Sequence, residues 1–275
     1  MSEEVSNDEE ARLSELENES LYILREAHRT MKKTAMLWSM GKDSTVMLWL
    51  ARKAFFGHIP FPVVHIDTSY KIPEMIRFRE EMAAKWALDL RISTNRAALA
   101  SGMHHSRGKL ECCTALKTEA LKEFLRQEGI HTIFAAIRRD EEGSRGKEKV
   151  FSPRGEGSVW KYKEQAPEFW NDYQTEYPDG TEVRVHPILR WTELDVWLYI
   201  RKYQIPVLDL YFSREGKRYR SVGCAPCTKA MISKARTLDE MIEELKTTKV
   251  GERAGRAQDL ADRYAMQKLR AKGYM

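Results

Sequence analysis

The chain has 275 residues, of which 42% are hydrophobic and 32% are charged. This composition can bury one sizeable core, and no apolar stretch reaches the roughly 20 residues that a membrane-spanning helix needs. The formal net charge of +5 is small beside 46 basic and 41 acidic residues, so charge gives nucleic acid little support as a partner. The acidic start, with neither a basic leader nor an apolar core, predicts a cytoplasmic protein.

Hydrophobic periodicity predicts strands that alternate with helices. An amphipathic helix over 8–30 is followed by a strand at 34–38, a turn containing Gly41, and a helix that begins at Ser44 or Thr45. Further strands and helices are expected at 61–66, 73–87, 88–93, 114–127 and 131–137. Elements that alternate in this way form a mainly parallel sheet with helices on both faces. We therefore expect an α/β fold that binds ligands at the carboxyl ends of its strands.

The alternating pattern loosens beyond residue 148. The remaining elements are expected to be a polar, aromatic flap at 159–180, a strand at 183–189, a helix with Thr192 as its N-cap, and a helix at 238–245. We expect a main domain over residues 1–210 and a C-terminal extension over residues 211–275.

The loop Ser39-Met40-Gly41-Lys42-Asp43-Ser44-Thr45 joins the first predicted strand to the helix that follows it. Backbone N–H groups at the start of a helix point toward one spot, and the helix dipole adds partial positive charge there. The loop is therefore suited to hold a pyrophosphate group. It is too short for the GxxxxGK[ST] loop of kinases and GTPases, which disfavours those classes.

The loop also resembles that of the PP-loop ATP pyrophosphatases, which reads S-x-G-K-D-S. Further segments resemble the small catalytic subunits of bacterial sulfate adenylyltransferases: SMGKDSTVMLWLARKAFF, IPFPVVHIDTSYK, IRRDEEGSRGKEKVFSPR, RVHPILRWTELDVWLYI, GERAGR and the terminal GYM. The resemblance implies that ATP binds with Mg²⁺ and is cleaved between its α and β phosphates. It further implies adenylyl transfer to sulfate, giving adenylylsulfate and pyrophosphate, with a GTPase subunit as partner.

The same resemblance implies roles for the loop residues. Lys42 is expected to neutralise charge on the leaving pyrophosphate. The other residues expected to hold the phosphates are Ser39, Gly41, Ser44 and Thr45. Asp43 either orients the loop or helps to hold Mg²⁺. Asp67, at the end of the second strand, either lies near the ribose or the metal or forms only the turn before Thr68.

A second charged segment, RRDEEGSRGK at 138–147, follows the fourth predicted strand. Either it is a solvated loop or it binds the substrate oxyanion and the α-phosphate during displacement. The substrate residues we expect are Arg138, Arg139, Asp140, Arg145 and Lys147, and those we expect to be catalytic are Arg139 and Arg145 together with Lys42. Asp140 and Glu141 are expected to orient these arginines, because sulfate needs no deprotonation.

The four cysteines form two pairs, Cys112 with Cys113 and Cys224 with Cys227. Adjacent cysteines bond poorly to each other, and a cytosolic setting disfavours disulfides. Four thiolates suit zinc or an iron–sulfur cluster. The segments ECCTALKTEAL and GCAPCTKA resemble those of the iron–sulfur adenylylsulfate reductases, which implies a 4Fe–4S cluster. Zinc and unligated thiols are the alternatives.

The chain departs from both groups of proteins that it resembles. The adenylyltransferase subunits lack the CC pair and carry a longer segment where this chain has only 212–220, a difference that bears on pairing with a GTPase. The reductases use a C-terminal cysteine that the tail YAMQKLRAKGYM lacks. Three alternative functions are therefore retained: a PP-loop enzyme of nucleic-acid thiolation with a cysteine desulfurase partner, an adenylylsulfate reductase-like protein, and a non-catalytic nucleotide-sensing module.

Overall fold

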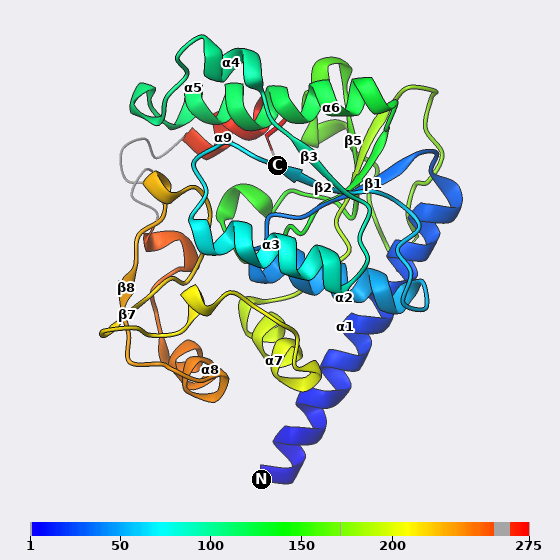
Figure 1. The fold of residues 1–275 in the computed structure, drawn as a ribbon. Coiled ribbons are helices and arrows are strands. Elements are labelled where there is room, and N and C mark those ends of the chain that lie inside the picture. The colour runs from blue at the N-terminus through cyan, green and yellow to red at the C-terminus, as the bar shows by residue number, and fades with distance from the viewer. Residues whose placement is uncertain (1, 171, 256–264, 275) are drawn as a thin grey trace.

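The computed structural model describes residues 2–170, 172–255 and 265–274. At its centre is a six-stranded sheet in the order β3-β2-β1-β4-β6-β5 (Figure 1). The strands are β1 (Thr34–Leu37), β2 (Val63–Ile66), β3 (Leu90–Ser93), β4 (Thr132–Phe134), β5 (Phe151–Arg154) and β6 (Glu182–Val185). All pair in parallel except β5, which is antiparallel to β6. The predicted α/β fold with a mainly parallel sheet is confirmed.

Helices cover both faces of this sheet (Figure 1). They are α1 (Ser2–Thr30), α2 (Lys42–Ala54), α3 (Pro73–Lys85), α4 (Arg96–Ala100), α5 (Lys109–Cys113), α6 (Ala120–Glu128), α7 (Glu193–Tyr203), α8 (Leu238–Thr247) and α9 (Ala265–Ala271). Strands β1 and β2 are buried along their whole length, as expected for strands covered on both faces. No helix in the described part of the chain is long and apolar enough to cross a bilayer.

Most of the predicted elements are present, although the strand expected at 183–189 covers only Glu182–Val185 and short elements such as α4 and α9 were not predicted. The helix expected at 114–127 is a π-helical segment, Thr114–Glu119, followed by α6. Strand β5 was not predicted, because its sequence contains Pro153 and lacks the expected alternation. Proline is tolerated there because β5 lies at the edge of the sheet, where one side needs no ladder hydrogen bonds.

The C-terminal part of the chain packs on the main sheet's helices. A small hairpin of β7 (Lys217–Arg218) and β8 (Met231–Ile232) precedes α8. Helix α8 packs against α7, and α9 packs against α5. The division into domains at residue 210 stays a prediction.

Helix α7 begins where the sequence predicts it. The Thr192 hydroxyl accepts a hydrogen bond from the Asp195 N–H at 3.1 Å, and the Asp195 carboxylate accepts one from the Thr192 N–H at 2.7 Å. This reciprocal pair is a capping box. Asp195 also binds Arg12 of α1 at 2.7 Å, so the cap ties the N-terminal helix to the start of α7.

Replacement of this cap should lower stability without changing the fold. We expect Thr192→Ala to reduce the free energy of unfolding by about 1 kcal/mol, because one helix N–H loses its acceptor. Urea unfolding followed by circular dichroism measures the change. Thr192→Ser, which keeps the hydroxyl, is the control and should lose less than half as much as the alanine variant.

Candidate active site

A cavity of about 180 Å³ lies at the carboxyl ends of β1, β2 and β4. This is where an open parallel sheet binds its ligands. The residues of the predicted phosphate loop that line it are Ser39, Gly41, Lys42, Asp43 and Ser44. The loop after β4 contributes Glu141 and Arg145, and the C-terminal part contributes Glu252, Arg253 and Tyr274.

The phosphate loop is a tight turn whose helix end is left open. Met40 has a φ of 62°, a left-handed conformation that costs energy for a residue with a side chain. Gly41 is the N-cap of α2 and offers no side chain to the first N–H groups of the helix. A Cβ at Gly41 would lie 3.3 Å from Ser39 Oγ, so the turn has little space for a larger residue. Apart from the N–H of Lys42, which donates to the Tyr211 hydroxyl, this helix end is suited to bind phosphate oxygens.

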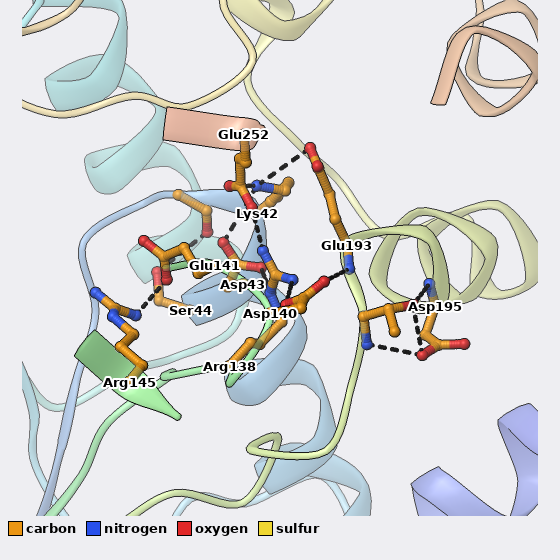
Figure 2. A network of polar contacts seen from close by, with 12 residues as sticks. Lys42, Asp43, Ser44, Arg138, Asp140, Glu141, Arg145, Glu193, Asp195 and Glu252 are labelled. Carbon is orange, nitrogen blue, oxygen red and sulfur yellow. Dashed lines mark hydrogen bonds and ion pairs between the residues drawn. The ribbon is translucent and has the colours of Figure 1, made fainter. Parts of the chain in front are cut away.

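Lys42 lines the cavity, with 1% of its side chain exposed. Its backbone N–H donates to the Tyr211 hydroxyl at 2.8 Å. Its Nζ forms an ion pair with Glu252 and lies 3.3 Å from Asp43 and 3.9 Å from Glu193 (Figure 2). Burial lowers the pKa of Lys42, but these carboxylates outweigh it and raise the pKa above its ordinary value. The side chain is therefore a permanent cation.

Arg138 is a second buried cation beside Lys42. Its side chain is fully buried, and its guanidinium binds Asp43 at 2.6 Å as well as Asp140 and Glu252 (Figure 2). Burial opposes the charge, but the carboxylates raise the pKa of Arg138 well above its ordinary value. Asp140 also accepts a hydrogen bond from the first N–H of α7 at 2.8 Å. Asp140 thus positions Arg138, whereas its expected role in orienting Arg139 and Arg145 stays a prediction.

Arg145 forms the opposite wall of the cavity with Glu141. The two side chains form an ion pair, and Arg253 binds the same carboxylate at 3.1 Å. Burial raises the pKa of Glu141, but Arg145 and Arg253 outweigh it and lower the pKa to about 2. Arg145 is 7% exposed, so an anion in the cavity would meet it in a largely water-excluded setting.

Six of the predicted phosphate and substrate residues, all in the described part of the chain, do not line the cavity. Two of them, Arg138 and Asp140, make the contacts described above. Arg139 is exposed and donates to the Glu148 carbonyl at 3.2 Å, and the Lys147 Nζ lies 4.3 Å from the Tyr162 ring centre. Asp67 accepts from the Ser69 N–H at 2.8 Å, which is the turn alternative considered for it. The Thr45 hydroxyl lies 3.2 Å from the Trp38 indole nitrogen. Their functional roles stay predictions.

Several residues that shape the cavity were given no role from the sequence. These are Glu193, Tyr211, Glu252, Arg253 and Tyr274. They lie on α7 or beyond it, far from the phosphate loop in sequence. Three of them lie in segments that carried the resemblance to the adenylyltransferase subunits: Glu252 and Arg253 in GERAGR, and Tyr274 in GYM. The resemblance did not indicate what these side chains contact.

Both cysteine pairs line one small cavity next to the nucleotide cavity. Thr68 Oγ1 lies 3.1 Å from Cys224 Sγ, and Lys117 lines this cavity as well as the larger one. The hydrogen bond from Cys227 lowers the pKa of Cys224 to about 3, while burial raises the pKa of Cys112 to about 11. In the described part of the chain, no three histidine, cysteine or acidic side chains are arranged to hold a single metal ion.

The fold and the cavity together define an α/β protein whose ligand site lies at the carboxyl edge of a mainly parallel sheet. The family model of the phosphoadenosine phosphosulfate reductase domain matches residues 33–230, so the chain belongs to this family.

Curated relatives match nearly the whole chain. Sulfate adenylyltransferase subunit 2 of Aeromonas salmonicida is 40% identical, over 98% of this chain and 97% of the relative. The protein of the same name from Rhizobium meliloti is 41% identical, over 95% and 92%.

Solved structures share the fold at low sequence identity. Phosphoadenylyl-sulfate reductase from Candida auris has a TM-score of 0.54 at 16% identity, over 76% of this chain and 89% of that chain. FMN adenylyltransferase from Candida glabrata, in complex with FAD and inorganic pyrophosphate, has a TM-score of 0.57 at 18% identity, over 80% and 64%.

Removal of the buried lysine should abolish most ATP cleavage. We expect Lys42→Ala to lower the rate of pyrophosphate release by about 10²–10³, the usual effect of losing one group that stabilises transition-state charge. Lys53→Ala, at the far end of the same helix, is the control and should keep the wild-type rate. Lys42→Gln keeps most of the side-chain volume, and circular dichroism checks that each variant is folded. A near-normal rate in folded Lys42→Ala would remove this residue from the mechanism.

Proposed function

We propose that the protein transfers the adenylyl group of ATP to sulfate. The observation that carries the proposal is the 40% identity to sulfate adenylyltransferase subunit 2 along nearly the whole chain. A sulfate oxygen attacks the α-phosphorus of ATP, and the bond from that phosphorus to the bridging oxygen of the β-phosphate breaks. Pyrophosphate leaves with the electron pair and adenylylsulfate remains, so no proton is transferred.

The charges of the cavity support this chemistry. Lys42 and Arg138 lie together by the start of α2, where they can bind the leaving pyrophosphate. Arg145 lies on the other wall, where it can bind sulfate or the α-phosphate. ATP brings Mg²⁺ with it, and the Asp43 carboxylate offers oxygen ligands. Burial raises the pKa of Asp43, but the neighbouring cations Arg138 and Lys42 outweigh burial and lower the pKa below its ordinary value. The carboxylate is therefore ionised.

A second subunit is part of the proposal. The relatives carry the name subunit 2, which implies that those enzymes have at least one other subunit. Because adenylyl transfer to sulfate is uphill, we propose a GTPase as that partner. A cysteine desulfurase is the partner that the thiolation alternative requires. The cysteine cavity beside the nucleotide cavity favours keeping that alternative in the test.

The proposed function is tested by exchange of labelled pyrophosphate into ATP. The purified chain, with and without a GTPase subunit, should catalyse exchange that depends on sulfate. Arg145→Ala should lower this exchange by about 10², because a buried donor facing the cavity is lost. Arg139→Ala, an equal truncation in an exposed position, should change it less than about threefold. Exchange that needs DNA and a desulfurase instead of sulfate would favour the thiolation enzyme.

We also propose that Cys112, Cys113, Cys224 and Cys227 hold a 4Fe–4S cluster. Their convergence on one cavity supports this ligand set. A cluster distributes four thiolates over four irons, so it does not require them to meet at one ion, as zinc does. The hydrogen bond from Cys227, together with the charges of Lys117 and Lys71, lowers the pKa of Cys224, which favours the thiolate that iron binds.

Metal analysis tests the cysteine proposal. Anaerobically purified protein should be brown and contain about four irons per chain. Each of the four Cys→Ser variants should lose the colour and melt at a lower temperature, since a site that joins distant segments contributes to folding. One zinc per chain in colourless protein would replace the cluster with a structural metal site. Metal-free protein with four titratable thiols would leave the cysteines unligated.

A further inference from the structure

The carboxylate of Glu252, which lines the nucleotide cavity, bridges the buried cations Lys42 and Arg138. One of its oxygens forms an ion pair with Lys42 Nζ and the other with Arg138 Nη2 (Figure 2). The Glu252 side chain is 5% exposed and begins a short 3-10 helix, Glu252–Gly255, in the C-terminal part of the chain. A pair of oxygens that each accept from one cation is also what a phosphate group offers.

This bridge has a physical cause in the burial of Lys42 and Arg138. A buried cation without a counter-charge costs several kcal/mol. Asp43 contacts both cations, at 3.3 Å from Lys42 and 2.6 Å from Arg138, but it lies on α2 itself and stays beside them whatever binds. Glu252 comes from a different part of the chain and, like Lys42, lines the cavity that a ligand would enter.

The size of the cavity agrees with an internal occupant. Its volume of about 180 Å³ lies below the roughly 300–1,000 Å³ of small-molecule sites. Burial raises the pKa of Glu252 to about 7 even though Lys42 and Arg138 lower it, and the nearby carboxylates Asp43 and Glu193 act in the same direction as burial. The surroundings of Glu252 therefore oppose its charge, which favours its exchange for another anion.

We propose that Glu252 occupies the subsite of the leaving pyrophosphate and that the nucleotide displaces it. The identity of this ligand rests on the proposed adenylyl transfer. In the exchange, phosphate oxygens replace carboxylate oxygens, so Lys42 and Arg138 are paired before and after. Arg253, the next residue, binds Glu141 at 3.1 Å and Glu142 at 3.2 Å. These ion pairs keep the segment attached to the cavity wall when the carboxylate moves out.

Calorimetric titration tests the displacement. The ligands are inorganic pyrophosphate and α,β-methylene ATP, which cannot be cleaved between its α and β phosphates. Glu252→Gln removes the competing charge, so both ligands should bind at least about threefold more tightly than to the wild type, because a larger share of the protein is ready to bind. Glu252→Asp keeps the charge but has a shorter side chain, so its affinity for both ligands should lie between those of the wild type and Glu252→Gln. Glu243→Gln, on the exposed face of α8, is the control with unchanged affinity.

Two outcomes overturn the proposal. Unchanged or weaker binding in folded Glu252→Gln, without Mg²⁺, means that the carboxylate does not compete with phosphate. Binding that weakens only when Mg²⁺ is present makes Glu252 a ligand of the metal instead. Thermal melting confirms that each variant is folded. The titrations contain no sulfate, so a failure of sulfate-dependent exchange in the wild type would sink the sulfate assignment and leave this result intact.

Discussion

The nucleotide site is organised around two cations that are buried side by side at the carboxyl edge of the sheet. Lys42 and Arg138 have almost no contact with water, and each therefore needs anionic partners from the protein or from a ligand. The partners come from four parts of the chain: α2, the loop after β4, the start of α7 and the C-terminal segment. This requirement explains why segments far apart in sequence are fixed around one cavity.

The sequence was sufficient for the parts of the fold that depend on local pattern. The buried strands β1 and β2 show as apolar runs, and the start of α7 shows through its capping box, because both signals lie within a few neighbouring residues. Strand β5 has no such signal, since its pairing with β6 is decided by the edge of the sheet that it meets.

The site residues that lie within one short stretch were predicted better than those brought together by long-range contacts. The loop 39–45 carries its chemistry within one short stretch, and most of it lines the cavity. In the loop after β4 the residue types were informative, but the sequence did not show where each side chain points. Arg138 points to the carboxylates of Asp43 and Glu252 (Figure 2), while its neighbour Arg139 donates to the Glu148 carbonyl. Glu252 was missed because its function depends on a contact across 210 positions of the chain.

The two ends of the described chain are attached by ion pairs of different character. Helix α1 is held partly through Arg12 and Arg201, whose side chains are 52% and 38% exposed. The C-terminal segment is held through Arg253 and Arg270, which are 13% and 2% exposed. Dissolved ions screen exposed pairs far more than buried ones. Rising ionic strength will therefore weaken the electrostatic attachment of α1 well before it loosens the segment that closes the nucleotide cavity.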